Sequence, residues 1–517
     1  MQDNHLSPPC VSSRSPVSAH SAVSRRHSLE ELAARIDWAL PAFAALAAAI
    51  VRLPELTRSP LWFDELFSMG VASMPAGEAL RRVIADHTNP PLFYLLLKGW
   101  MAMGGESDAW VRLLPCLLSV LAVGALVWLA REARAGAVAG ALAIALFVAS
   151  PLSVDLANEV RAYALLSLLA TLSLAATLQE ARRPSRATLL QLTLINIALV
   201  HTHYFGWFTV GAEVTVGALV WRGEAARRIT RSAVYTAIAF LPWAAAVVVN
   251  AARETTPLRN VAWIGAPDLA APLWLLRDFT GRSGYAAADL AWLAFVCCAL
   301  ALLARRAVQQ RAATRSIDER AAPQAAEAGT LALLATAGLG VPLVLWVASL
   351  AGAHSIWVQR YLLGAAAPVA LLVAIAIAAL PPRRWRVAAI IGACWVAVAL
   401  AELPKRPPTK FDWRRFTRRI DVAPGSPSNL YALEAFTAAP LQRYARPGML
   451  VHHIGSLDQL PDGDAWLVYR PESFASRTPA DALLARNYRV LTSLTAETAG
   501  QRIVAMRITR PTPSSAH

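Results

Sequence analysis

The sequence predicts an α-helical polytopic membrane protein with about eleven transmembrane helices and a small C-terminal α/β domain. Of its 517 residues, 56% are hydrophobic and 16% are charged, whereas soluble chains carry about 25% charged residues. The mean hydropathy is +0.42. The apolar residues also fall in blocks of about 17–21, which is the length a helix needs to cross a bilayer. Composition and block length together exclude an ordinary soluble protein.

The order of the spans follows from the apolar blocks. Residues 1–35 are rich in Ser, Pro, Arg and His and predict a disordered basic tail. The first apolar block, near residues 38–53, lacks a small-residue cleavage site, so we expect a retained signal-anchor helix. The later spans are expected near residues 111–130, 136–153, 162–178, 188–203, 204–221, 232–250, 286–304, 330–350, 360–380 and 386–402.

The arginines indicate how these spans are oriented. Arginine-rich loops follow every second span, near residues 131–134, 182–186, 222–231, 305–320 and 383–386, and the loops between them are poorer. Because short cytoplasmic loops carry an excess of Lys and Arg, we expect the N-terminus in the cytoplasm. The transmembrane part then covers residues 36–403. The long first loop, residues 54–110, and the C-terminal region, residues 404–517, lie on the outer face.

The C-terminal region has a different sequence pattern. Short β-like runs near residues 430–433, 451–454, 466–469 and 503–506 alternate with helical stretches near 437–445 and 479–486. A region of about 110 residues can bury a core of its own. We therefore expect a small α/β domain outside the membrane.

Charge and cysteine content exclude two classes of function. The formal net charge is +15, but the basic residues lie between apolar blocks instead of forming one face, which suits a lipid bilayer and not a nucleic acid. The five cysteines form no CxxC pair and no Cys/His cluster. Neither a disulfide framework nor a structural zinc site is expected.

Two adjacent carboxylates mark the first outer loop. Asp64 and Glu65 follow two aromatic residues shortly after the first span. An aromatic belt at the membrane interface with solvated acids is the simpler interpretation of this pair alone. The same loop continues through His87 to Asn89 and a double proline, which predicts an extended entry into an apolar helix at the membrane surface.

Further polar groups fall on the same predicted side of the membrane. Glu159 and Arg161 precede Tyr163 at the mouth of a helix, and a snorkelling arginine with an acidic partner would also explain them. Other polar side chains of that face are His201, His203, Arg360 and Tyr361. The two histidines could bind a divalent metal or a phosphate, or could simply lie at the interface. The convergence of these clusters on one face predicts a functional site there.

These residues, taken in order, resemble the GT-C glycosyltransferases, and in particular the branch of protein O-mannosyltransferases and lipid A aminoarabinose transferases. The resemblance covers about residues 36–420. It is carried by the runs Trp62 to Glu65, Asn89 to Tyr94, Arg112 to Pro115, Glu159 to Leu166, Arg360 to Leu363 and Phe411 to Arg414. One departure is Asn89, because a histidine is common at this place in the family.

The resemblance implies a bacterial inner-membrane enzyme that transfers a sugar from a polyprenyl-phosphate donor at the outer face. The acceptor would be a hydroxyl of a glycolipid, an envelope glycan or a protein. Carried over residue by residue, the resemblance makes Asp64 the base. Arg161 and Arg360 would hold the leaving phosphate. Glu65 would disfavour ionisation of both neighbouring carboxyls, and Glu159 would orient the acceptor or an arginine.

The remaining candidate residues are expected to contact donor or acceptor: His87, Asn89, Tyr163, His201, His203 and Tyr361. No cofactor is required by this chemistry, and a divalent metal is left open because related enzymes differ in its use. The alternative function is a transporter or flippase of lipid-linked sugars. Transporters place their polar groups near the bilayer midplane, whereas the acids here lie in an outer loop.

Overall fold

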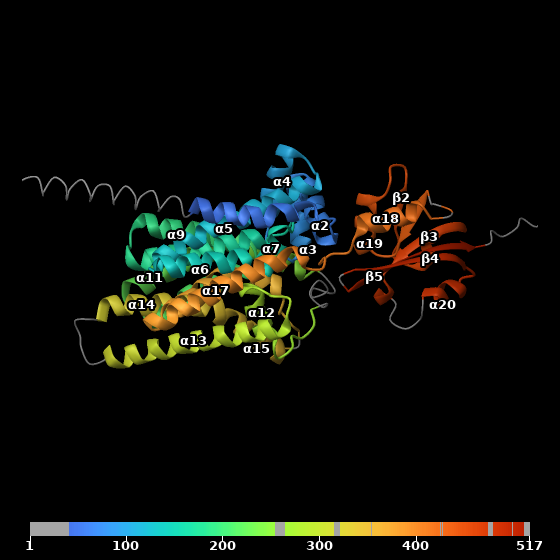
Figure 1. Cartoon of the computed structure of the whole chain (residues 1–517). Helices are drawn as coiled ribbons and strands as arrows, with labels where there is room; N and C mark the ends of the chain where they lie inside the picture. The colour runs from blue at the N-terminus through green and yellow to red at the C-terminus, as the bar shows by residue number, and fades with distance from the viewer. Residues whose placement is uncertain are drawn as a thin grey trace, which may run out of the picture.

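The computed structural model describes residues 41–253, 264–314, 321–352, 354–423, 425, 428–473, 479–498 and 500–510. The predicted tail, residues 1–35, lies outside these ranges. A bundle of long helices and a smaller part built on a β-sheet lie end to end, with the C-terminal sheet beyond one end of the bundle (Figure 1). The predicted fold class is confirmed.

Among the described residues, seven helical segments are long and apolar enough to cross a membrane. They contain α5 (Asp108–Glu132), α8 (Tyr163–Arg182), α11 (Gly223–Ala251), α13 (Ala286–Thr314), α14 (Ala321–Ala335) with η4 (Thr336–Gly340) and α15 (Val341–Ala351), η5 (Gln359–Ala365) with α16 (Ala366–Ala378), and α17 (Pro382–Glu402). Helices α6 (Gly136–Ala149) and α7 (Pro151–Ala157) meet at a bend of 58° and could form an eighth span. The chain is a multi-pass membrane protein.

Among the described residues, every predicted span is mostly helical. Three predicted spans fall on shorter helices, which are the helix over residues 41–52, α9 (Arg186–Thr202), and α10 (Gly206–Val216) followed by η2 (Gly217–Trp221). The bend between α6 and α7 follows from the sequence, because Pro151 lacks the N–H that would continue α6 and the Ser150 hydroxyl caps the new helix. The total number of crossings stays a prediction.

The first long loop, residues 54–110, is helical throughout most of its length. It contains η1 (Leu53–Thr57), α2 (Phe63–Ser73), α3 (Ala76–Asp86) and the apolar α4 (Leu92–Gly104). The helix expected after the double proline is α4. Helices α2, α3 and α4 lie at the end of the bundle that faces the C-terminal sheet (Figure 1).

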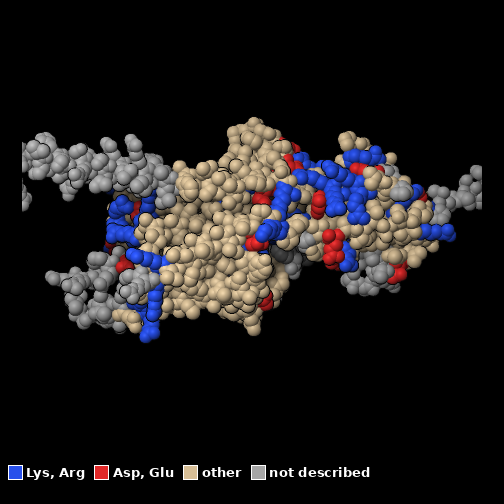
Figure 2. Space-filling model, in the orientation of Figure 1, with Lys and Arg blue, Asp and Glu red and all other residues tan. Residues whose placement is uncertain are grey.

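The centre of the bundle is formed by α5, α8, α6 and α16, which belong to one buried apolar cluster. Helices α11, α13 and α17 expose apolar side chains such as Leu241, Leu290 and Ile390, as expected for helices that face lipid. Lysine and arginine gather at the ends of the bundle and over the C-terminal part, and the flank between them is nearly free of charge (Figure 2). This distribution fits an apolar belt in a bilayer.

The C-terminal part is a five-stranded mixed sheet in the order β2-β1-β3-β5-β4. Strands β1, β2 and β3 are parallel, and β5 pairs antiparallel with β3 and β4. Successive side chains of β3 alternate between two apolar clusters, with Trp466 and Val468 in one and Leu467 and Tyr469 in the other. The predicted β-like runs are confirmed as β1, β2, β3 and β5, and the predicted helices as α19 and α20, whereas β4 was not predicted.

The bounds of these elements are α18 (Trp413–Asp421), β1 (Asn429–Ala432), α19 (Ala435–Tyr444), β2 (Leu450–His453), η7 (Leu457–Gln459), β3 (Gly463–Tyr469), η8 (Pro471–Ser473), α20 (Pro479–Leu484), β4 (Arg489–Thr498) and β5 (Gln501–Arg510). Two further elements complete the bundle, α12 (Ala271–Thr280) and η6 (Leu403–Lys405).

Candidate active site

The polar residues singled out from the sequence lie on four elements at one end of the bundle. The first turn of α2 carries the two acids, and the link between α7 and α8 carries Glu159 and Arg161. The link between α9 and α10 contributes His203, and η5 contributes Arg360. Because successive membrane helices alternate in direction, links that are far apart in sequence meet at this end.

Asp64 is the acid of this site that solvent reaches. Its side chain is 23% exposed, and its Oδ2 atom lies 3.8 Å from Nη2 of Arg360. The Arg360 guanidinium also lies 5.6 Å from the centre of the Trp62 ring. Asp64 is therefore a carboxylate that a ligand can reach from solvent, with a cation beside it.

Glu65 is 0% exposed and accepts hydrogen bonds from four residues, one of them the backbone N–H of Trp62 at 3.2 Å. Arg112 donates Nε to Oε1 at 2.9 Å and Nη2 to Oε2 at 2.7 Å, and Lys410 Nζ donates to Oε2 at 3.1 Å. The backbone N–H of Val160 donates to Oε1 at 3.2 Å. Burial alone would raise the pKa of Glu65, but the charges of Lys410 and Arg112 and these hydrogen bonds lower it to about 2. Glu65 therefore ties three segments together as a permanent anion.

Glu159 differs from both acids of α2. It is buried, and among the residues that the structure describes its Oε1 atom has no hydrogen-bond partner. Burial raises its pKa, and the nearby positive charges of Lys410 and Arg360 offset only part of that effect. A buried carboxyl with an unused oxygen can turn toward a hydroxyl that enters the site.

Arg161 is buried beside two polar side chains of the first loop. Its Nη1 atom lies 3.4 Å from the Ser68 hydroxyl and 3.5 Å from the Tyr94 hydroxyl. The side-chain amide of Asn89 lies 3.0 Å from Arg161 Nη2 and 3.1 Å from His203 Nε2. Asn89, at which the sequence departs from the GT-C pattern, thus bridges a cation and a histidine.

His203 is buried among aromatic rings. Its ring centre lies 5.0 Å from that of Tyr361 and 6.1 Å from that of Tyr163. Burial and the positive charges of Arg161 and Arg360 lower the pKa of His203 to about 3. The imidazole is therefore neutral at physiological pH and adds no further positive charge.

His87 and His201 belong to the same end of the bundle but contact other elements. His87 ends α3 in the left-handed conformation (φ 55°), and its Nε2 atom lies 2.9 Å from Asn250 Nδ2 of α11. His201 lies in the last turn of α9, with Nδ1 2.8 Å from the carbonyl oxygen of Ile197 and its ring against Phe240. Over the described part of the chain, no group of three or more His, Cys, Asp or Glu side chains could hold a metal ion.

Comparison with known proteins links this geometry to a fold. No family model and no curated protein matches the chain, but solved structures do. The chain is similar to ArnT from Cupriavidus metallidurans bound to undecaprenyl phosphate, with a TM-score of 0.55 and 15% identity over 91% of this chain and 98% of ArnT. The chain has the GT-C fold.

Two other enzymes share the GT-C fold over much of this chain. The arabinofuranosyltransferase AftD from Mycobacteria matches with a TM-score of 0.53 and 15% identity over 91% of this chain and 40% of its own. The Archaeoglobus fulgidus oligosaccharyltransferase tethered to an acceptor peptide matches with a TM-score of 0.50 and 13% identity over 80% of this chain and 64% of its own.

Three side chains of the site, Lys410, Arg112 and Tyr94, were assigned no function from the sequence. Lys410 is separated from Glu65 by 345 residues, and its Nζ atom also lies 5.8 Å from the centre of the Trp62 ring. Arg112 was recognised only as part of a motif, and Tyr94 likewise. Lysines are scarce in the sequence, and that scarcity was the one signal that could have drawn attention to Lys410.

A small groove of about 20 Å³, lined mostly by apolar side chains, adjoins the site. Leu166 of α8, Phe205 and Thr209 near the start of α10, Val341 of α15 and Tyr361 of η5 line it. Tyr361 also contacts His203, so the groove begins where the polar cluster ends. A ligand with a charged head and an apolar tail would find both environments side by side.

The C-terminal part is docked onto the same end of the bundle. The Tyr444 hydroxyl donates to Asp108 Oδ2 at 2.7 Å and accepts from the Leu61 N–H at 2.6 Å. Arg414 and Arg443 also bond to the Asp108 carboxylate, at 2.6 and 2.9 Å. These contacts fix the start of α5 and the segment leading into α2, and thereby the position of the acids.

Proposed function

We propose that this chain is an integral-membrane glycosyltransferase that moves a sugar from a polyprenyl-phosphate donor to a hydroxyl acceptor. The observation that carries the proposal is the approach of Asp64 Oδ2 to Arg360 Nη2, at 3.8 Å, beside a buried Arg161 and an apolar groove. Such a site offers a proton acceptor, fixed positive charge and a place for a lipid tail.

The environments of the three acids support Asp64 as the base in this proposal. Glu65 already accepts hydrogen bonds from Arg112, Lys410 and a backbone N–H. Glu159 is buried away from solvent, and burial raises its pKa. Asp64 is partly exposed and lies at the rim, so an acceptor hydroxyl can reach it.

The proposed reaction forms one bond and breaks another. The acceptor oxygen attacks the anomeric carbon of the sugar, Asp64 takes the proton of the hydroxyl, and the bond from that carbon to the phosphate oxygen breaks. Attack from the face opposite the phosphate inverts the anomeric centre through an oxocarbenium-like state. Arg161 and Arg360 stabilise the phosphate as it leaves.

The remaining side chains position this machinery. Glu65 fixes the first turn of α2 through Arg112 and Lys410, and Asn89 with neutral His203 sets the direction of Arg161. The isoprenoid tail would leave the site past the groove that Leu166, Phe205 and Tyr361 line and continue in the bilayer. That the solved ArnT structure holds undecaprenyl phosphate supports a donor of this class.

A transporter is the weaker proposal because of where the charges lie. The polar cluster lies at one end of the bundle, on links between helices. Glu213 of α10 is buried deeper, but Asn196 donates to its Oε2 at 3.0 Å and Ser173 bonds to its Oε1. Both carboxylate oxygens of Glu213 thus accept hydrogen bonds, and the residue holds α8, α9 and α10 together.

We further propose that the protein resides in a bacterial inner membrane with its N-terminus in the cytoplasm and its site on the periplasmic face. Residues 36–403 then form the catalytic membrane domain and residues 404–517 an outer α/β domain. The acceptor class is a hydroxyl of a glycolipid, an envelope glycan or a protein.

The decisive experiment is transfer of labelled sugar from polyprenyl phosphate by the purified, reconstituted protein. Asp64→Asn keeps the shape of the side chain and removes its basicity, and we expect turnover to fall by roughly 100-fold or more. The matched control is Glu78→Gln, which changes an exposed acid of the same loop. Adding EDTA to the same assay tests whether a divalent metal takes part. Transfer by Asp64→Asn at the wild-type rate would refute Asp64 as the base.

A further inference from the structure

A second cavity lies at the opposite end of the bundle, and the proposed function makes no use of it. Helix α5 starts at Asp108 against the C-terminal part and ends at Glu132, about 37 Å away at 1.5 Å per residue. Helix α8 starts beside the candidate active site and ends at Arg182. The ends of these two helices line a cavity of about 290 Å³.

The lining of this cavity is almost entirely basic. Its five residues are Arg131, Glu132, Arg134, Arg182 and Arg183. Four guanidinium groups against one carboxylate leave a net charge of +3. The volume is close to the lower end of the range for small-molecule sites, about 300–1,000 Å³, which suits a compact head group.

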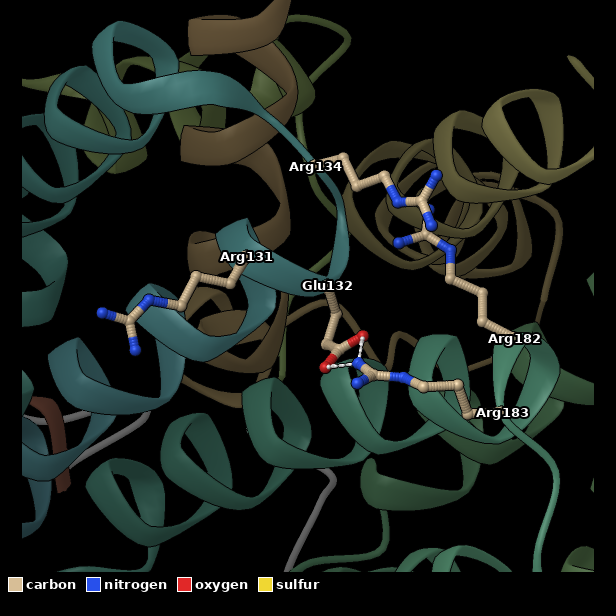
Figure 3. Close-up of a pocket in the computed structure, with 5 residues that line it drawn as sticks. All are labelled: Arg131, Glu132, Arg134, Arg182 and Arg183. Atoms are coloured by element: carbon tan, nitrogen blue, oxygen red, sulfur yellow. Dashed lines mark hydrogen bonds and ion pairs between the residues drawn. The ribbon is translucent and has the colours of Figure 1, made fainter. Parts of the chain in front are cut away.

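The one acid of the lining is already engaged. Arg183 Nη2 donates to both carboxylate oxygens of Glu132, at 2.6 and 2.8 Å. In Figure 3 this pair lies on one side, and the ends of Arg134 and Arg182 lie beside each other on the other. Arg182 donates to the neutral hydroxyl of Thr330 at 2.9 Å and is repelled by the charges of Arg134 and Arg183. Glu132 also attracts Arg182, but its single negative charge cannot balance the three guanidinium groups of Arg134, Arg182 and Arg183.

The backbone at Arg134 adds a second, independent observation. Arg134 ends α5 in the left-handed conformation (φ 53°), where the Ala135 N–H bonds to the Ala130 carbonyl oxygen. Glycine takes this position after a helix with less strain than any side chain. The chain has a guanidinium at a place where backbone energetics favour glycine.

A general excess of positive charge in cytoplasmic loops accounts for the number of these arginines. That general excess does not explain why the arginines at the ends of two helices, α5 and α8, line the same cavity. Two adjacent guanidinium groups match the paired oxygens of a phosphate, which both accepts their hydrogen bonds and cancels their repulsion. We propose that this cavity binds a phosphate group, held mainly by Arg134 and Arg182.

Two sources supply such a group at a membrane surface: the head group of an anionic phospholipid and a soluble phosphate compound. Two probes separate them. Native mass spectrometry of protein from phosphatidylglycerol-containing nanodiscs measures retained lipid. Inorganic pyrophosphate, added to lipid-free protein in neutral detergent, measures soluble binding through the shift in Tm. Retention without a Tm shift identifies the lipid source, and a Tm shift identifies the soluble source.

The variant pair is Arg134→Gln with Arg182→Gln, and the control pair is Arg384→Gln with Arg386→Gln, which removes the same charge from exposed positions at the start of α17. We expect the first pair to weaken binding of the responding probe at least tenfold and the control pair to leave it unchanged. An equal loss of probe binding in both pairs would show that any positive charge at this end attracts the probe, and would overturn the proposal. No loss of binding in either pair would overturn it as well.

Arg134→Gly distinguishes the loss of a ligand contact from a loss of protein stability. It removes one guanidinium and relieves the left-handed backbone, so Tm without ligand should stay the same or rise. Weaker probe binding together with an unchanged or higher Tm supports a ligand contact. Undiminished binding by Arg134→Gly and by the Gln pair would show that the cavity has no phosphate site.

Discussion

The ion pair of Glu65 allows a quantitative test of how the site is held. Its Oε atoms bond to Arg112 and Lys410 within a fully buried environment. Glu65→Gln keeps the size of the side chain and leaves both cations without their anion. Breaking a buried pair by removing one partner costs about 3–5 kcal/mol.

The pKa gives a second route to this magnitude. A fall from the usual value of 4.5 to about 2 corresponds to roughly 3 kcal/mol at about 1.4 kcal/mol per pKa unit. Since the folded pKa lies below the unfolded one, this stabilisation is present above about pH 4.5 and is lost as the pH falls toward 2. The two routes agree on about 3–5 kcal/mol. At roughly 2.1 cal/mol/K per residue, the 517-residue chain unfolds with an entropy of roughly 1.1 kcal/mol/K, so we expect Glu65→Gln to lower Tm at neutral pH by roughly 3–5 °C.

The assay is thermal unfolding of the purified protein in detergent, followed by tryptophan fluorescence. The control is Glu55→Gln, which removes an acid paired with Arg58 on the exposed side of the same loop and should cost about 0–1 kcal/mol. Combining Glu65→Gln with Lys410→Met should recover part of the lost stability, because one stranded cation is removed. A Tm of Glu65→Gln equal to that of the wild type would refute the argument.

Three further predictions concern the site and its membrane face. Arg360→Lys should retain part of the sugar transfer and Arg360→Ala should lose most of it, with the donor KM and turnover measured in the same reconstituted assay; unchanged constants would make Arg360 an interfacial anchor. Glu159→Gln should leave Tm unchanged or raise it at pH 8, because burial raises the pKa of this carboxyl and its ionisation costs more as the pH rises above 4.5; a clear loss of Tm would show that the anion is stabilising. In a cysteine-free background, an impermeant thiol reagent on spheroplasts should label Ser456→Cys and not Ser185→Cys, and the reverse pattern would invert the proposed orientation.

The spans and the neighbourhood of the site could be predicted because both depend on local sequence. Apolar blocks mark helices, and residues that flank every second link lie at the same end of a bundle. The sequence therefore predicted that Asp64, Glu159, Arg161 and Arg360 lie at one end of the bundle. It did not predict their contacts.

The contacts themselves depend on the direction of single side chains. His201 and His203 are two residues apart, but α9 ends at Thr202. His201 therefore follows helical geometry toward Phe240, whereas His203 has extended backbone angles and turns toward Tyr361. A shift of one residue in the helix end would reverse this result, and sequence patterns do not fix helix ends that closely.

Long-range partners are also beyond local patterns. Nothing near Lys410 indicates a partner 345 residues earlier in the chain. Strand β4 was missed because its side chains alternate mostly between exposed and half-buried positions, so it lacks the apolar run that identified β3. The Lys410 contact depends on the docking of the C-terminal part on the bundle, and β4 is defined by its pairing with β5.

The docking of the C-terminal part limits how this protein can be recombined with its relatives. A chimera joined at residue 404, where the membrane helices end, would bring in a foreign segment at Lys410 and replace Arg414, Arg443 and Tyr444 together. Asp108 would then lie against a foreign surface that lacks the partners it bonds to in this protein. A working exchange has to keep residues 405–412 with the bundle and match the incoming surface to Asp108. The two parts are separate in architecture, but these contacts make them one unit for any exchange.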